Sequence, residues 1–184
     1  MREIDEMIVR YCAPTLAGLK MAALICIPRC FEPLERITQS YNQRFNNKGL
    51  FFRILCSCGK RHLFYIYWPK LVSAYISCPH VAAFMSGRGY GADLPLQDAL
   101  DRLAERFNEQ RDFPHELGIF LGYPLEDVLG FIRYKGKMAK CCGEWKVYGD
   151  VGKACRRFDV YNCCRRDFMR RYDNGATLDK LIIA

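Results

Sequence analysis

The sequence predicts an α+β fold, a helix-dominated single domain of residues 1–184 around a small, largely antiparallel sheet. Three observations support this prediction. Segments that begin at a proline and repeat apolar residues at helical spacing recur along the chain. Two short aromatic-rich segments, 50–56 and 62–68, have the pattern of paired strands. The 184 residues, 51% of them apolar, are enough to bury the core of one domain.

Two helices are expected near the N-terminus, over residues 4–11 and 14–27. The first repeats apolar side chains at helical spacing (Ile4, Met7, Ile8, Tyr11). Pro14 favours the start of the second, because a proline in the first turn gives up no N–H that the helix needs. The apolar run 12–28 contains Lys20 and is shorter than the roughly 20 apolar residues that span a bilayer. We therefore expect a buried helix and no membrane association.

The remaining elements follow in order. A helix is expected after Pro33, and then a hairpin whose strands at 50–56 and 62–68 flank a turn with Gly59. Helices are expected at 69–78 and 95–108, with the glycine-rich segment 87–92 as a loop between them. Pro114 begins a short helix that ends at 122–124, and another helix covers 125–132. A strand at 145–148 and a long helix at 151–172 complete the prediction.

The expected helix at 151–172 has an apolar face and a basic face. Its arginines gather on the basic one (Arg156, Arg157, Arg166, Arg170, Arg171). With a formal net charge of +8, this surface can attract an anionic ligand or nucleic acid, or can simply be solvated. No nucleic-acid-binding motif, P-loop or dinucleotide fingerprint accompanies it, so a nucleic-acid partner is not favoured.

The segment FPHELGIFLGYPLEDVLGF, residues 113–131, combines a histidine, acids and glycines. Next to Pro114 at a helix start, His115 is expected to be neutral near pH 7, as a general base must be. An ordinary capping or core histidine is the alternative. Glu126 and Asp127 suit the first turn of the next helix, where the helix dipole favours acids by about 0.3–1 kcal/mol. The glycines indicate close packing against other elements (Gly118, Gly122, Gly130).

Cys12 is a candidate nucleophile. If the second helix begins at Pro14, the thiol lies at a helix N-terminus, where free N–H groups lower a cysteine pKa from about 8.5. The chain order of Cys12, His115 and then Glu116 or Asp127 is the order of papain-like cysteine enzymes, although their local cysteine signatures are absent. A packed, inert Cys12 is the alternative.

The cysteine content bears on the compartment and on metals. The chain has 11 cysteines and begins with acids rather than a secretory signal, which favours a reducing cytoplasm over a disulfide framework.

On the expected hairpin, Cys56, Cys58 and His62 offer two thiolates and an imidazole to a metal, although Cys-x-Cys is tighter than the usual zinc spacing. A plain tight turn is the alternative. The sequence contains no recognisable motif for binding haem or an iron–sulfur cluster.

Three long segments carry a resemblance to a known family: CAPTLAGLK (12–20), FPHELGIFLGYPLEDVLGFI (113–132) and GEWKVYGDVGKACRRFDVYNCC (143–164). Together they resemble domain of unknown function 3793, a family of uncharacterised proteins of clostridia and other anaerobic bacteria. The resemblance covers nearly the whole chain. It implies a cytoplasmic protein of an anaerobe and no particular activity. Members often carry histidine before the first cysteine, where this chain has Tyr11, and that difference weakens the case for chemistry at Cys12.

The leading hypothesis is a thiol-dependent acyl hydrolase or transferase. Cys12 would be the nucleophile, His115 the base, and Glu116 or Asp127 the orienting acid. Four more residues are expected in the pocket wall (Lys20, Trp145, Lys146, Tyr148). One alternative is a non-catalytic accessory protein of anaerobic redox metabolism that binds a metal, haem or another anionic cofactor. The other is an anion- or nucleic-acid-binding module.

Overall fold

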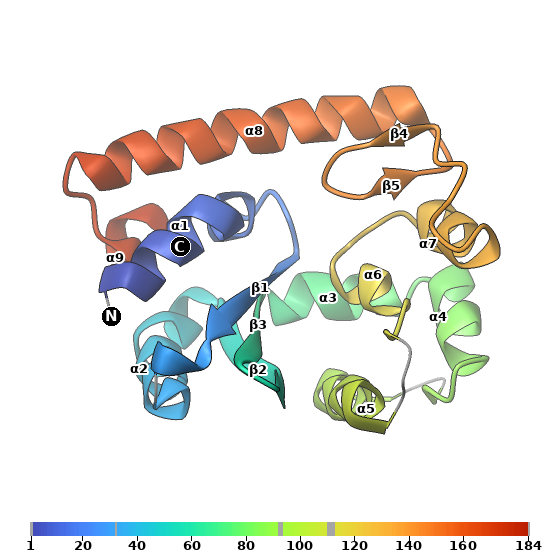
Figure 1. Ribbon diagram of the computed structural model, residues 1–184, viewed down its shortest axis with the longest axis horizontal. Coiled ribbons are helices and arrows are strands. Elements are labelled where there is room, and N and C mark those ends of the chain that lie inside the picture. Colours follow the sequence, from blue (N-terminus) through green and yellow to red (C-terminus); the bar gives the residue numbers. More distant parts are fainter. Residues whose placement is uncertain (1, 32, 92–93, 110–112, 184) are drawn as a thin grey trace.

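A computed structural model describes residues 2–31, 33–91, 94–109 and 113–183. The chain has the α+β architecture that the sequence predicts, with helices around a three-stranded sheet and a second sheet of two strands. Figure 1 shows the long helix α8 (Val151–Asp173) along one edge of the molecule. Helix α1 (Arg2–Leu16) lies beneath the C-terminal end of α8, and the two-stranded sheet lies beneath its N-terminal end.

The main sheet is antiparallel, with the strand order β1-β3-β2. Its strands are β1 (Ala22–Pro28), β2 (Phe51–Cys58) and β3 (Arg61–Tyr67). Strands β2 and β3 are the expected hairpin, and Gly59 in its turn has φ 57°, which glycine adopts without strain. Strand β1 pairs with β3 from Ala22 opposite Tyr67 to Pro28 opposite Arg61. As an edge strand, β1 tolerates a proline at its end.

The prediction of a helix at 14–27 is wrong. Helix α1 continues through Pro14 to Leu16, and Gly18 then adopts φ 66°, the left-handed conformation that ends many helices. The residues from Ala22 to Pro28 form β1 instead of a helix. The apolar run therefore holds a helix end, a turn and a buried strand, which hydrophobicity alone does not distinguish.

The other expected helices are present with small shifts at their ends. They are α2 (Leu34–Phe45), α3 (Pro69–Ile76), α5 (Leu96–Glu109), α6 (Leu117–Phe120), α7 (Leu125–Arg133) and α8. The helices α4 (Pro79–Ser86) and α9 (Leu178–Leu181), and the 3-10 turns Arg29–Phe31 and Asn46–Lys48, have no counterpart in the prediction. The strand expected at 145–148 is β5 (Lys146–Val147), which pairs with β4 (Cys141–Cys142). The expected loop at 87–92 is present through residue 91, and residue 92 lies outside the described residues.

Helices cover both faces of the main sheet. On one face, Phe64 and Ile66 of β3 pack in a core with residues of α1, α2 and α9. On the other face, Tyr65 and Tyr67 pack with residues of α3, α4, α5 and α6. Adjacent residues of β3 alternate between the two cores, as side chains of a strand must.

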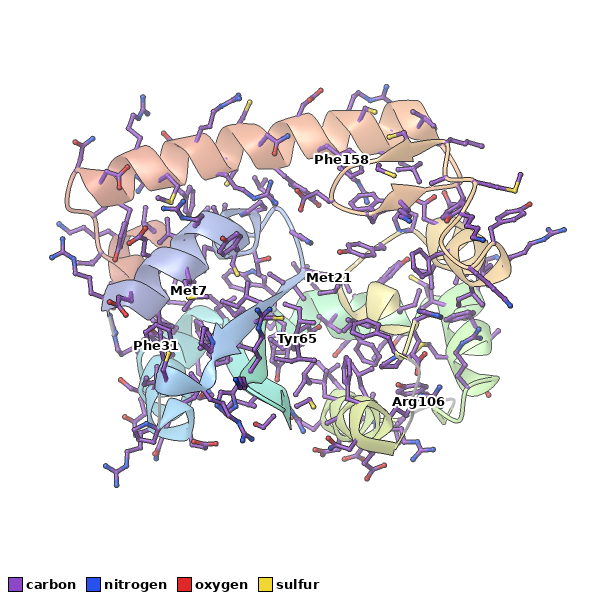
Figure 2. The ribbon with its side chains drawn as sticks, viewed as in Figure 1. Met7, Met21, Phe31, Tyr65, Arg106 and Phe158 are labelled. Atoms are coloured by element: carbon purple, nitrogen blue, oxygen red, sulfur yellow. The ribbon has the colours of Figure 1, made fainter. Side chains whose placement is uncertain are left out.

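A third, smaller core joins α8 to the β4–β5 sheet. It consists of Trp145, Val147, Ala154, Phe158 and Tyr161. Figure 2 marks Phe158 on the side of α8 that faces this sheet, and its ring lies 4.7 Å from the Trp145 ring at an angle of 77°. The apolar face predicted for the helix at 151–172 is therefore the buried one. Within the described ranges, no helix is both long enough and apolar enough to cross a membrane.

Candidate functional site

The segment 12–20 places its two reactive side chains in different environments. Cys12 lies on the inner face of α1 and belongs to the core around it. After the helix ends, Gly18 reverses the chain, and the amides of Leu19 and Lys20 both donate to the Pro14 carbonyl, at 2.9 and 3.0 Å. Lys20 thereby leaves the helix end and lines a cleft, whereas Cys12 stays in the core.

Cys12 does not have the environment of a nucleophile. Pro14 lies inside α1, so no helix begins after Cys12, and the thiol is fully buried. Burial raises the pKa of Cys12 to about 12, although the charges of Lys20 and Arg165 oppose the rise. A thiol with this pKa is protonated at neutral pH. The prediction that a helix N-terminus ionises this sulfur is wrong, and Cys12 is a packed core residue.

His115 does not lie with Cys12. Its imidazole is exposed and meets the Phe131 ring edge-on, with 5.2 Å between the ring centres. It lines a cavity of about 580 Å³, and Cys12 lines neither this cavity nor the larger cleft described below. The cysteine–histidine pair on which the thiol hypothesis depends therefore has no support in the geometry.

Glu116 joins two parts of the fold. Its carboxylate is buried, forms an ion pair with Arg106 of α5, and accepts a hydrogen bond of 3.3 Å from the Tyr90 hydroxyl. Figure 2 labels Arg106 beside α5, from which it reaches the segment before α6. Because breaking a buried ion pair leaves an uncompensated charge, these contacts explain Glu116 as a structural acid.

Asp127, in the first turn of α7, fastens that helix to the β4–β5 sheet. One carboxylate oxygen accepts a hydrogen bond of 2.7 Å from the Trp145 indole nitrogen. The other accepts from the backbone amides of Tyr148 and Gly149, at 2.7 and 2.8 Å. Three donors to one buried carboxylate hold it in a single orientation.

Lys146 and Tyr148 also serve the packing of this region. The Lys146 ammonium donates to the Gly136 carbonyl at 2.6 Å. The Tyr148 ring stacks on Tyr134 with 5.8 Å between ring centres, and its hydroxyl has no hydrogen-bond partner among the described residues. Lys146 lines the smaller cavity, and Tyr148 lines neither cavity. The glycines of the segment 113–131 pack closely, as expected. A Cβ would lie 2.8 Å from Val128 at Gly118, 2.9 Å from Met21 at Gly122 and 2.3 Å from the Tyr148 ring at Gly130.

A cleft of about 980 Å³ lies between the start of α8, the α3–α4 pair and α7. This volume is at the upper end of the roughly 300–1,000 Å³ of small-molecule sites. Aromatic and basic side chains share its wall (Lys20, Tyr75, His80, Trp145, Lys153, Arg156, Arg157, Tyr161). Its acids are Glu126, Asp127 and Asp150. Two of these are engaged, since Asp127 accepts the three hydrogen bonds above and Asp150 caps α8 by accepting from the Lys153 amide at 2.9 Å.

The basic residues at the start of α8 are not neutralised by ion pairs. In the described part of the chain, Arg165, Arg170 and Arg171 of α8 form salt bridges, whereas Lys153, Arg156 and Arg157 form none. These three cations are exposed and line the cleft. A concave surface with uncompensated cations attracts anions more strongly than an exposed flat one, because its low-dielectric walls focus the field.

Lys20 is the most buried cation of the cleft. Its side chain is 11% exposed, and its ammonium lies 3.8 Å from the Glu144 carboxylate and 5.5 Å from the centre of the Tyr123 ring. Glu144 lies closer to Arg165, which donates to the same oxygen at 2.6 Å. Burial lowers the pKa of Lys20 and the Arg165 charge adds to the effect, while Glu144 and Cys12 oppose it.

The smaller cavity adjoins this cleft. The two share Leu121, Asp127 and Trp145 in their walls. Apart from His115, Asp127 and Lys146, the smaller cavity is lined by apolar and aromatic residues. Of the predicted site residues, Lys20 lines only the cleft, His115 and Lys146 line only the smaller cavity, and Asp127 and Trp145 line both.

The hairpin does not have the arrangement of a metal site. His62 is buried and its Nδ1 lies 2.8 Å from the Ser57 hydroxyl, while Cys56 is disulfide-bonded. The Cys58 side chain lies outside the described residues. Across the part of the chain that the structure describes, no three histidine, cysteine or acidic side chains are grouped so as to hold a metal ion.

Sequence reasoning missed part of the cleft wall. Tyr75 and His80 come from α3 and α4, and α4 itself was not expected. No local pattern marks these two residues, because only the packing of α3 and α4 opposite α8 brings them to the cleft. Arg156 and Arg157 belong to the basic face that the sequence predicts for this helix. The sequence does not indicate, however, that these two arginines line a cleft and that those at the other end of the helix do not.

Comparisons with known proteins give a family and nothing finer. No curated protein and no solved structure matches the chain. The model of one family, described as protein of unknown function (DUF3793), matches residues 8–182, which is nearly the whole chain. The protein therefore belongs to the DUF3793 family.

Proposed function

We propose that this protein binds a small anionic molecule in the cleft at the start of α8, as a binding or accessory protein rather than a thiol enzyme. One observation carries the proposal: Lys153, Arg156 and Arg157 form no salt bridge within the described residues and face a cleft of about 980 Å³. Lys20 adds a buried charge to the same cleft. Guanidinium groups are preferred partners of phosphate and carboxylate, which they bind through paired hydrogen bonds.

The aromatic wall favours a ligand that has a ring or another flat apolar part beside its charge. Trp145 and Tyr161 line the cleft next to the cations, and the Trp145 ring is held by Asp127, Tyr123 and Phe158. Because Tyr123 stacks on the Trp145 ring and only 7% of Trp145 is exposed, a ligand would contact the exposed part of a ring that loses little conformational freedom on binding. We expect an aromatic phosphate to bind more tightly than inorganic phosphate.

The same observations disfavour a nucleic-acid interface along α8. At the far end of the helix, Asp167 pairs with Arg170 at 2.6 Å and lies 3.9 Å from Arg171. Acidic partners therefore interrupt the row of cations along this helix, whereas an electrostatic footprint for a nucleic acid would be a continuous stripe.

Isothermal titration calorimetry with pyrophosphate and with phenyl phosphate tests the proposal. We expect Arg156→Gln/Arg157→Gln to weaken binding of either probe by about tenfold or more, since one charge-assisted hydrogen bond contributes about 1.5–3 kcal/mol. The matched control is Arg166→Gln/Arg170→Gln, which removes the same charge from the same helix outside the cleft, and it should change affinity less than about threefold. Equal losses in the two variants would indicate a non-specific effect of net charge.

A further inference from the structure

Lys20 has a position that a simple counter-ion for a bound anion does not require. The left-handed turn at Gly18 brings it to the cleft wall directly after the end of α1. Its side chain is only 11% exposed, although the residue lines the cleft. The exposed cations at the start of α8 supply charge without this burial, and Lys20 is therefore free to have another role.

Burial of the amine and the nearby Arg165 favour its neutral form, whereas Glu144 and Cys12 favour the charged form. The groups around it come from four parts of the fold: Glu144 from the β4–β5 turn, Arg165 from α8, Cys12 from α1 and Tyr123 from the segment before α7. The only carboxylate among them, Glu144, is held by Arg165 at 2.6 Å and lies 3.8 Å from Lys20. Because Glu144 is shared with Arg165, which lies closer to it, the charge of Lys20 is poorly compensated. Burial and Arg165 together lower the pKa of Lys20.

We propose that Lys20 is a covalent attachment point for an aldehyde or ketone group of a small anionic ligand that occupies the cleft. This inference rests on the proposed function, since the α8 cations would hold the anionic group while the carbonyl group meets the amine. Desolvated lysines next to another cation are the lysines that form imines with carbonyl compounds.

The reaction needs no oxidant, reductant or further co-reactant. The lone pair of the Lys20 Nζ attacks the carbonyl carbon and forms a C–N bond. Both hydrogens of the neutral amine leave with the carbonyl oxygen as water, and the product is an imine. The Glu144 carboxylate, 3.8 Å from the amine, can accept a proton that the amine releases before attack.

Reductive trapping tests this inference. The protein is incubated at pH 7.5 with pyridoxal 5′-phosphate, an anionic aldehyde, and then with sodium borohydride, and the modified lysines are mapped by peptide mass spectrometry. We expect Lys20 to be modified at least tenfold faster than the exposed Lys60 and Lys180 of the same molecules. Pyridoxal, which lacks the phosphate, should modify Lys20 more slowly and the two exposed lysines at an unchanged rate. Equal or slower reaction of Lys20 with pyridoxal 5′-phosphate would overturn the inference.

The pH dependence of the modification provides a second test that needs no variant. The rate at Lys20 should reach half its maximum at a pH below the value of about 10.4 for ordinary lysines. A midpoint at or above that value would overturn the inference. Failure here is distinguishable from failure of the proposed function. If pyrophosphate binds but Lys20 is not modified, the proposed anion site stands and the inference about Lys20 fails. If Lys20 is modified but pyrophosphate does not bind, the proposed function fails.

Discussion

The Trp145 indole nitrogen donates a 2.7 Å hydrogen bond to Asp127, and this contact lies in the wall shared by the two cavities. The same carboxylate accepts from the Tyr148 and Gly149 amides. Asp127 thus fixes the position of the ring that lines both cavities. The acid proposed from sequence as a catalytic partner acts, in the structure, by positioning the site.

Asp127→Asn should destabilise the protein by about 2–4 kcal/mol in urea unfolding. The substitution keeps the size of the side chain, but its NH₂ group would face a donor where the carboxylate now accepts. The neighbouring Glu126→Gln removes an exposed charge from the same turn and should change stability by less than about 0.5 kcal/mol. Similar values for the two variants would show that the three hydrogen bonds are not what holds α7 to the β4–β5 sheet.

Gly130→Ala should also destabilise the protein, by about 1–3 kcal/mol, although alanine is the better helix former. A Cβ at this position would lie 2.3 Å from the Tyr148 ring, so either α7 or the ring must move. Gly152→Ala in the first turn of α8 is the matched control, since its Cβ would have no neighbour closer than 3.5 Å. There we expect a gain of about 0.5–1 kcal/mol, measured in the same unfolding experiment. A stabilising Gly130→Ala would contradict the close packing described above.

Cys12 should be among the last cysteines to react with iodoacetamide in the native protein. It is fully buried, and burial raises its pKa to about 12, whereas Cys26 and Cys30 are exposed. Peptide mass spectrometry after brief labelling at pH 7.5 should find the two exposed cysteines modified and Cys12 modified only after denaturation. Labelling of Cys12 ahead of them would restore the thiol-enzyme hypothesis.

The free energy of unfolding should fall at high pH because Tyr123 is harder to ionise in the folded protein than in the unfolded chain. Burial raises the pKa of Tyr123 to about 12, and the nearby Glu144 and Tyr161 add to the rise. Between pH 10 and 12 the unfolded chain releases this proton and the folded chain retains it, so the stability that it contributes below pH 10 declines as the pH rises. Urea unfolding at pH 9 and pH 11.5 should show a loss about 1–3 kcal/mol larger in the wild type than in Tyr123→Phe. Parallel losses in both proteins would contradict this assignment.

The sequence predicts best the elements whose pattern is complete within a few residues. The hairpin at 50–68 has two aromatic strands and a glycine turn, and the helix at 151–172 has a clear apolar face, so both are present as expected. The run 12–28 is different. There Pro14 resembles a helix start, but the helix continues past it, and β1 is stabilised by pairing with β3 some forty residues away. Such pairing leaves no local signal.

The candidate site, too, could be predicted from the sequence only in part. Four residues were expected in a pocket wall; Lys20 and Trp145 line the cleft, Lys146 lines the smaller cavity and Tyr148 lines neither. The chain order that relates Cys12 to His115 carries no information about distance, and the fold separates them into a core and an exposed cavity wall. Tyr75 and His80 reach the cleft only through the packing of α3 and α4, so a single sequence could not reveal them.

Side-chain NMR of the arginines tests the central claim most directly. The Nε–Hε signals of Arg156, Arg157, Arg166 and Arg170 can be assigned from the single glutamine variants and followed while pyrophosphate is added. We expect the signals of Arg156 and Arg157 to shift and saturate together while those of Arg166 and Arg170 stay in place. Shifts confined to Arg166 and Arg170, or equal and non-saturating shifts of all four, would contradict an anion site at the start of α8.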